Sequence, residues 1–470
     1  MSRAWLLTDL TYGDAAKGAT VDYLARSEPV HTVVRFNGGP QAGHNVVTPD
    51  GRHHTFSQFG SATFLPDVIT YLSRYMLINP LNAFKEEEHL QSLGVTDAFD
   101  RMFVHPECLV ITPFHVAANQ IREIARGNDR HGSCGMGVGE TVSDSLSTYP
   151  SDVLRADDLA DSTVVARKLM LARDRILAAI RSTGTISPAL EAQNIPEFSD
   201  PGLVEAFVEA AQAYAKRIWI APNAFLGDRM RKGTTVFEPA QGTLLDEDFG
   251  FHPHTTWSRT TLTNAEEILK TVDFQGEIIR MGLIRAHSTR HGAGPFVTHD
   301  PAMTEKFFDH CNHTGVWQGA MRYGPLDLVA TRYALAANPG IDRLAVSHLD
   351  MVDVDPRGWS FCRRYLVGAP DDHALLYPDM AFCDTNGEIA NLVAQSRPPV
   401  PSQSRLTRQE RLGRFLDKRC SPKIEYVPAP ASTQALDIIE QELGLPVYIG
   451  ANGPKATDRR SLYDSTHAAA

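Results

Sequence analysis

The first 45 residues constrain the fold most, because apolar runs alternate there with glycine-rich turns. Residues 3–10 (RAWLLTDL) contain a four-residue apolar run and predict a short buried strand, which ends at the loop GDAAKG of residues 13–18. Residues 19–27 (ATVDYLARS) have helical spacing, and residues 31–39 (HTVVRFNGG) predict a second strand that enters a second glycine turn. Strand, loop, helix and strand in this order open a parallel α/β sheet.

Three later segments extend the same prediction. They are TTVFEPAQG (234–242), RLAVSHLD (343–350) and PVYIGANGP (446–454), and each ends in polar or glycine residues, where open α/β sheets place ligands. We therefore predict an α/β fold with a large, mostly parallel central sheet and flanking helices. Amphipathic stretches predict a helical insertion at about 150–220, and residues 360–425 are expected to be irregular. The whole chain, 1–470, is expected to form a single domain.

Composition narrows the class of partner. The chain has 470 residues and a formal charge of −11, which argues against nucleic acid as the main partner. Its six cysteines contain no C-x-x-C pair, so we expect neither a zinc site nor a disulfide framework. No apolar run is long enough to span a membrane, so we expect no membrane partner and a cytoplasmic location.

Four glycine-rich stretches carry the chemistry: residues 13–18, 37–45, 131–140 and 291–296. Backbone N–H groups freed by glycine bind anionic oxygens, and a following helix adds the positive end of its dipole. One such stretch is weak evidence, since glycine often serves only a tight turn. Four in one acidic chain predict a phosphate site.

Asp14 is the unusual member of the first loop, because an acid repels phosphate unless it binds a metal or accepts a proton. The alternative is a helix N-cap, which is common for Asp at such a junction. His44, between glycines at a strand end, is a candidate acid. Lys17 could neutralise phosphate, although most lysines are simply solvated.

Taken together, GDAAKGATVDYLA, VVRFNGGPQAGHNVV, VFEPAQGTLLDEDFGFHPHTT and STRHGAGPF resemble adenylosuccinate synthetase. The likeness runs from about residue 5 to 350, with a fainter match at 449–456. It implies a P-loop-NTPase-like sheet and a homodimeric ligase that depends on GTP and Mg²⁺. Such a ligase joins L-aspartate to C6 of a purine nucleoside monophosphate, IMP by default, through a 6-phosphoryl intermediate.

The resemblance also assigns roles to single residues. Asp14 would take the purine N1 proton and ligate Mg²⁺ with the carbonyl of Gly43, and His44 would assist the departing β–γ bridge. The residues that would contact the donor phosphates are Gly13, Ala15, Ala16, Lys17, Gly18, Gly43 and His44. Those that would contact the monophosphate are Gln41, Ser133, Cys134, Gln241 and Thr256. Thr289 and Arg322 would bind aspartate, and the donor base would contact His348, Asp350, Gly453 and Pro454.

Departures from the family pattern keep alternatives open. His348 replaces a lysine of the donor-base site, so ATP is an alternative to GTP. Ala320 aligns with an arginine that contacts the ribose 2′-hydroxyl, and Arg155 is the nearest match to the arginine that a partner subunit supplies. Residues 54–61 and 131–140 also resemble a phage branch, an N6-succino-2-amino-2′-deoxyadenylate synthase, which would aspartylate dGMP with ATP, dATP or GTP.

Two further readings lie outside ligase chemistry. One is a nucleotide-binding sensor that does not turn over, and the other is an NTP hydrolase. Retention of Asp14, His44 and Arg322 speaks against the sensor, and a hydrolase leaves Arg322 without a role.

Overall fold

The computed structural model describes residues 2–182, 198, 200–307, 315, 317–368, 379–384, 386–395, 403–428 and 432–462. A ten-stranded sheet forms its centre. The strands are β1 (Arg3–Asp9), β2 (Val30–Arg35), β5 (Ile69–Leu72), β7 (Met102–Val104), β9 (Trp219–Ile220), β10 (Thr234–Glu238), β11 (Glu277–Arg285), β15 (Arg343–Ser347), β20 (Val447–Ala451) and β21 (Arg459–Ser461).

Their spatial order is β21-β20-β15-β11-β1-β10-β2-β5-β7-β9. Neighbouring strands of this sheet run parallel, except for the antiparallel pair β20–β21 at one edge. The predicted mostly parallel sheet is therefore confirmed. The strands expected at 3–10, 31–39, 234–242, 343–350 and 446–454 are β1, β2, β10, β15 and β20.

The central strands are buried on both faces, because helices cover each side. Along β1, Leu6 packs into one core and Leu7 into another on the opposite face. Helix α1 (Lys17–Ser27) supplies Val21 to the core of Leu7, whereas α10 (Thr263–Thr271) and α12 (Leu328–Ala337) belong to the core of Leu6. Strands buried in this way carry continuous apolar runs, as Ala4–Leu7 within β1 do.

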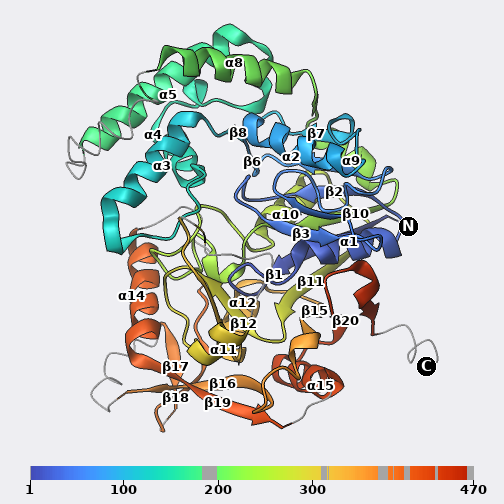
Figure 1. Cartoon of the computed structure of the whole chain (residues 1–470), viewed down its shortest axis with the longest axis vertical. Coiled ribbons are helices and arrows are strands. Elements are labelled where there is room, and N and C mark those ends of the chain that lie inside the picture. Colours follow the sequence, from blue (N-terminus) through green and yellow to red (C-terminus); the bar gives the residue numbers. More distant parts are fainter. Residues whose placement is uncertain are drawn as a thin grey trace.

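Helices gather at one end of the molecule, around a second large core (Figure 1). They are α2 (Pro80–Ser92), α3 (Pro113–Arg126), α4 (Val138–Ser147), α5 (Ser162–Ser182) and α8 (Pro201–Ala215), with α9 (Asn223–Met230) beside them. Helices α5 and α8 lie within the insertion expected at 150–220, and they pack on each other.

The opposite end carries a smaller sheet with α14 and α15 (Figure 1). It comprises β14 (Leu326–Asp327), β16 (Trp359–Val367), β17 (Ala381–Cys383), β18 (Glu388–Leu392) and β19 (Cys420–Val427), with α14 (Gln403–Arg419) and α15 (Ser432–Leu443). Strands β16 to β19 and helix α14 occupy the described part of residues 360–425, the stretch expected to be irregular.

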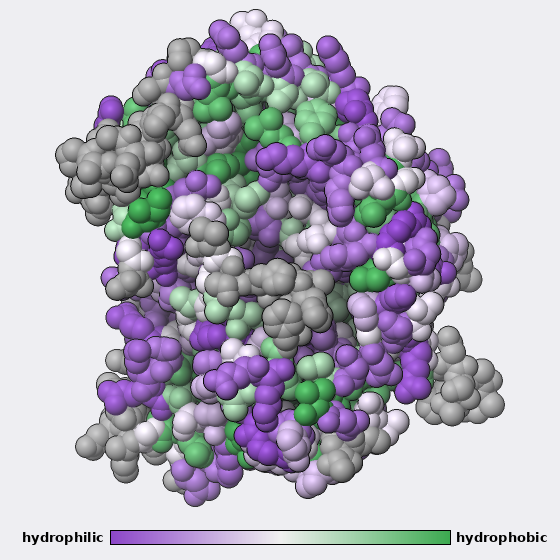
Figure 2. Space-filling model, viewed as in Figure 1, coloured by the Kyte–Doolittle hydropathy of each residue, from purple (hydrophilic) through white to green (hydrophobic). Residues whose placement is uncertain are grey.

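Other short elements lie outside these two sheets, among them a short 3-10 helix, Leu349–Met351, after β15. They also include the pairs β3 (His44–Val47) with β4 (His53–Phe56), β6 (Leu77–Ile78) with β8 (Leu109–Val110) and β12 (Ser288–His291) with β13 (Met321–Gly324), and helix α11 (Pro301–Lys306). Hydrophilic residues dominate the face in Figure 2, and apolar ones form small separate patches there. Among the described residues, no helix has the length and apolarity that crossing a bilayer requires.

Candidate functional site

Several of the predicted site residues follow the carboxyl ends of the central strands of the large sheet. Strands β15, β11, β1, β10 and β2 are adjacent and parallel, so their carboxyl ends share one edge. The loop of residues 13–18 follows β1, residues 36–44 follow β2, and Gln241 follows β10. Parallel topology thus brings distant segments together, as expected for a ligand site of an open α/β sheet.

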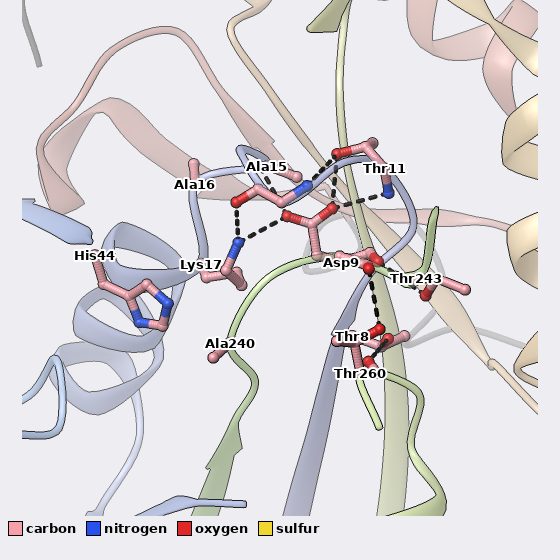
Figure 3. A network of polar contacts seen from close by, with 12 residues as sticks. Thr8, Asp9, Thr11, Ala15, Ala16, Lys17, His44, Ala240, Thr243 and Thr260 are labelled. Atoms are coloured by element: carbon pink, nitrogen blue, oxygen red, sulfur yellow. Dashed lines mark hydrogen bonds and ion pairs between the residues drawn. The ribbon is translucent and has the colours of Figure 1, made fainter. Parts of the chain in front are cut away.

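Asp9, the last residue of β1, organises the first glycine loop (Figure 3). One carboxylate oxygen accepts the N–H and hydroxyl of Thr11 at 2.8 and 2.7 Å, and the other accepts the Ala15 N–H at 2.9 Å. The Lys17 ammonium lies 2.9 Å from this second oxygen and also donates to the Gly13 carbonyl. Lys17, predicted to face phosphate, is therefore paired inside the loop in this structure.

The same loop has a left-handed backbone at its entry to α1. Ala16 has φ 53° at the N-cap of the helix, and Gly13 has φ 107°. No side chain caps the helix, so Asp14 is not an N-cap here. The N-terminal N–H groups of α1 face the loop, as an anion site at a helix N-terminus requires.

Asp14 differs from Asp9 in its contacts. Within the described residues, no hydrogen bond or ion pair reaches its carboxylate. Burial raises the pKa of this carboxyl, and the positive charges of Arg285 and Lys17 and the His291 ring oppose that rise. An unpartnered carboxylate beside a phosphate-type loop is a hard oxygen ligand of the kind that Mg²⁺ accepts, and it can also act as a base. The donor set therefore fits Mg²⁺, with Asp14 and the exposed Gly43 as its protein ligands.

His44 opens β3 and lies against the start of α1, where a Cβ on Gly18 would come within 2.8 Å of the His44 Cβ. Its Nδ1 lies 2.5 Å from the Glu238 carboxylate, whose pKa is lowered to about 2 by Arg35, His44 and Ser61 although burial opposes this. Burial, with the Arg35 charge, lowers the pKa of His44 to about 4. The resting pair is therefore a neutral imidazole that donates Nδ1–H to an ionised carboxylate.

Two glutamine side chains end in the same region. The Gln41 amide has neither its oxygen nor its nitrogen paired, and the Gln241 Oε1 is likewise buried without a partner in the part of the chain that is described. Gln241 has φ 56°, and its Oε1 lies 3.1 Å from where a Cβ on Gly38 would stand. Unpaired buried amides are costly unless a ligand satisfies them.

The loop of residues 131–137 is held by helix α3. Asn119 donates to the Ser133 hydroxyl at 2.9 Å and accepts from the Gly137 N–H at 3.1 Å. Next to it, Gln120 donates to the Gly135 carbonyl at 3.2 Å, and Glu123 accepts from the Gly132 N–H at 3.2 Å. Such anchoring presents Ser133 and Cys134 from a fixed loop. Burial raises the pKa of the Cys134 thiol to about 11, so this thiol stays protonated.

The residues predicted to bind the substrate aspartate lie on the antiparallel pair β12–β13. Arg322 pairs in register with Arg290, and Thr289 is the neighbouring position on β12. The Arg322 guanidinium donates to the Gly294 carbonyl at 2.9 Å, and burial lowers the pKa of Arg322 to about 10. Its Nε is buried without a protein acceptor among the described residues, which leaves it available to a carboxylate. Thr256 is held by its own N–H, which donates to the Leu245 carbonyl at 2.8 Å.

His348 is turned toward the interior. The Arg285 guanidinium lies 2.6 Å from its Nε2, and Arg285 also donates to the Thr289 hydroxyl at 3.2 Å. Asp350 is exposed in the short helix after β15. The carbonyls of Gly453 and Pro454 accept from Arg459 at 3.3 and 3.0 Å, which fixes that loop.

Sequence reasoning missed the residues behind the site: Asp9, Glu238, Arg285 and the polar face of α3. Asp9 and Glu238 end two predicted strands, and a charge at the end of a buried strand was the available signal. The nearest match to a partner-supplied arginine, Arg155, donates to the Glu107 carbonyl of its own chain at 2.9 Å.

Comparison with known proteins gives a consistent family. The adenylosuccinate synthetase family matches residues 7–369. The chain is 29% identical over 377 residues to the adenylosuccinate synthetase of Chlorobium chlorochromatii (strain CaD3), which covers 79% of this chain and 81% of the relative. It is 30% identical over 352 residues to that of Clostridium botulinum (strain 657 / Type Ba4), covering 74% and 78%.

Solved structures share the fold. Fully ligated adenylosuccinate synthetase from Plasmodium falciparum superimposes with a TM-score of 0.76 at 18% identity, over 97% of this chain and 99% of that one. Succinoaminodeoxyadenylate synthetase of cyanophage S-2L, bound to dGMP and to dATP as an energy donor, gives 0.57 at 15% identity, over 98% and 95%. The chain therefore belongs to the adenylosuccinate synthetase family and is a ligase that forms a carbon–nitrogen bond in purine biosynthesis.

Proposed function

We propose that this ligase uses GTP and Mg²⁺ to couple L-aspartate to C6 of a purine nucleoside monophosphate, with IMP as the default substrate. One observation carries the proposal. The carboxylate of Asp14 has no partner among the described residues, whereas the cation of the same loop, Lys17, is neutralised by a different acid, Asp9. A phosphate loop with its own buried ion pair does not need Asp14 for structure, which leaves that carboxylate for chemistry.

The residues suggest an order of events. Asp14 accepts the proton from purine N1, and O6 forms a bond to the γ-phosphorus while the bond from that phosphorus to the bridging oxygen breaks. His44, whose Nδ1–H stays on Glu238, takes up a proton from solvent at Nε2 and gives that proton to the departing oxygen. The aspartate amine then adds at C6, and the phosphate on O6 leaves with the electron pair of the C6–O bond. Arg322 holds the aspartate carboxylate during this step.

A Mg²⁺ ion on Asp14 and the carbonyl of Gly43 would supply neutralisation of phosphate charge. The backbone N–H groups at the start of α1 act in the same direction, because they already point at the loop. Gln41 brings an amide NH₂ that is unpaired among the described residues to the monophosphate, and Gln241 lies in the same region. Ser133 and Cys134 come from the loop that Asn119 anchors. His348, Asp350, Gly453 and Pro454 remain the proposed donor-base residues.

The test is a phosphate-release assay that crosses GTP, ATP and dATP with IMP, dIMP, GMP and dGMP, with and without aspartate. We expect aspartate-dependent phosphate release with GTP and IMP, and a product heavier by one aspartyl group in mass spectrometry. Asp14→Asn should abolish release while donor binding persists. A rate of phosphate release that does not depend on aspartate would instead indicate a hydrolase. Binding of nucleotide without phosphate release would indicate a sensor.

A second candidate substrate is dGMP. Ala320 is exposed and carries no group that could contact a ribose 2′-hydroxyl, and the cyanophage enzyme of the same fold binds dGMP and dATP. In the same assay, turnover confined to dGMP would favour this alternative, and introducing Ala320→Arg should then raise the relative rate with a ribonucleotide.

We also propose a homodimer that works in the cytoplasm. Leu146 and Tyr149, at the end of α4 and just beyond it, are 71% and 78% exposed. Exposed apolar side chains that adjoin one another mark interaction surfaces, and these two lie three residues apart in the chain. Light scattering of wild type and of Leu146→Glu should show a dimer that the charge weakens.

A further inference from the structure

A buried acid behind His44 has no part in the proposed reaction. Glu238 is the last residue of β10 and is fully buried. Its Oε1 lies 2.5 Å from the His44 Nδ1 and also accepts the Ser61 hydroxyl, and its Oε2 accepts the Ser61 N–H at 2.9 Å. Both oxygens are therefore engaged, and the carboxylate has little freedom to rotate.

The charge of Glu238 is balanced inside the protein. Arg35 is its register partner on β2, and it is also fully buried. A buried carboxylate is costly unless a cation and hydrogen bonds compensate it, and here both are present. Lys17 is the other cation near His44, and its ammonium is bound to Asp9.

These contacts select one form of the imidazole. An ionised carboxylate can only accept, so the His44 Nδ1 must carry a hydrogen. Consequently Nε2 is the free nitrogen, and it is buried without a partner among the described residues. The start of α1 packs against the other side of this residue, since a Cβ on Gly18 would lie 2.8 Å from the His44 Cβ.

We infer that Glu238 is a positioning residue, which holds His44 in its Nδ1–H form with Nε2 directed to the donor phosphates. The inference rests on the role proposed above for His44. It predicts that Glu238 affects the cleavage of the donor rather than the binding of aspartate or of the monophosphate. The pairing of a carboxylate with a histidine for orientation is a general device of acid–base catalysis.

Glu238→Gln is the informative change because it keeps the shape. The new NH₂ group must face either the Ser61 N–H, which is a donor clash, or the His44 Nδ1, which would force the hydrogen onto Nε2. We therefore expect the neutral Nε2–H form of His44 to appear, without the carboxylate charge that stabilises the imidazolium, so that this form is a much weaker acid toward the departing oxygen. Glu238→Asp keeps the charge and should restore part of the wild-type behaviour.

The experiment has two independent readouts on the full chain. Long-range ¹⁵N–¹H NMR of histidine-labelled protein, with His44 assigned by its loss in His44→Gln, reports the tautomer at one fixed pH. Scrambling of ¹⁸O from the β–γ bridge of GTP, measured with IMP and without aspartate, reports donor cleavage. We expect Glu238→Gln to slow scrambling and kcat by about 100-fold, with KM for IMP and aspartate within about threefold.

Glu86→Gln is the matched control. Glu86 is a buried carboxylate on α2 that accepts the N–H groups of Ser57 and Gln58 at 2.8 and 2.9 Å, but no contact joins it to His44. It should leave the tautomer and the scrambling rate unchanged even if it lowers thermal stability.

The outcomes separate the inference from the proposed function. An Nδ1–H signal in wild type that is lost in Glu238→Gln, with slower scrambling, supports the inference. An unchanged tautomer, or equal effects of Glu238→Gln and Glu86→Gln on scrambling, overturns it. Absence of turnover in wild type contradicts the proposed function alone, because the NMR comparison still decides whether Glu238 orients His44.

Discussion

Replacement of Asp9 by Asn isolates the ion pair beneath the glycine loop. The side chains of Asp9 and Lys17 are 0% and 3% exposed, so water cannot replace a lost partner. Asn would keep an oxygen for Thr11, but its NH₂ group would face the Ala15 N–H and the Lys17 ammonium, which are both donors. Breaking a buried pair from one side costs about 3–5 kcal/mol, and we expect a loss of free energy of unfolding in that range.

Asp22→Asn is the control on the neighbouring helix. It makes the same chemical change in a carboxylate that is 1% exposed, but burial already raises the pKa of Asp22, and its partner Arg26 is 26% exposed and can be solvated. We expect a loss of about 1 kcal/mol or less, since partly exposed pairs contribute little. Urea unfolding followed by circular dichroism, at constant m-value, measures both changes.

A second variant tests the electrostatic cause. Asp9→Asn combined with Lys17→Met removes the unpaired charge, so the double variant should be more stable than the sum of the single changes predicts, by about 2–3 kcal/mol. Binding of GTP to the double variant should not recover with stability, because the Ala15 N–H and the loop remain unanchored. Calorimetry should show binding that is at least about tenfold weaker than in wild type, a loss of roughly 1.4 kcal/mol. If Asp9→Asn costs no more than Asp22→Asn, or if Lys17→Met rescues nothing, the reasoning is wrong.

Three further changes have defined outcomes. Arg322→Ala should raise KM for aspartate by about 10- to 100-fold with little change in KM for the monophosphate, which steady-state kinetics will show; an equal rise in both would contradict the aspartate role. Gly18→Ala gains about 1 kcal/mol of helix propensity but places a Cβ 2.8 Å from the His44 Cβ, so overpacking of about 1–3 kcal/mol should win and lower the melting temperature. Burial raises the pKa of Asp327 to about 6, so its contribution to stability falls as pH rises from about 4 to about 6. Thermal melting at a series of pH values compares the two proteins: wild type should lose about 3 kcal/mol of stability between pH 4 and pH 6, and Asp327→Asn should not show this loss. Equal pH dependence in the two proteins would refute this.

The sheet could be predicted because its signals are local. Apolar runs that end in glycine predict buried parallel strands and their loops, and β1, β2, β10, β15 and β20 follow those runs. Their order in space could not be read from the chain, since β1 lies between strands that begin at residues 234 and 277. Register across the sheet depends on packing of residues far apart in sequence.

The position of His348, a predicted donor-base residue, depends on the register between two strands. Arg285 pairs with Ser347, so the next residue of β15, His348, comes beside the Arg285 side chain. The sequence indicates that His348 replaces a lysine, but the positive φ of 59° that turns it inward depends on the three-dimensional setting. Anchoring of the 131–137 loop by Asn119 is likewise a tertiary contact without a motif.

The acids of the site divide into two kinds, and this division explains why a phosphate loop contains Asp14. Three acids each lie behind a functional segment and accept hydrogen bonds from it: Asp9, Glu238 and Glu123. Donor groups of the protein therefore compensate their charges. Asp14 receives no such bond in the part of the chain that is described, and burial raises the pKa of its carboxyl. A fold that already neutralises its structural acids with lysine, arginine and backbone donors can leave one carboxylate unpaired at low structural cost. That carboxylate then meets a cation or a proton from the substrate, which is the role a ligase requires and a simple phosphate binder does not.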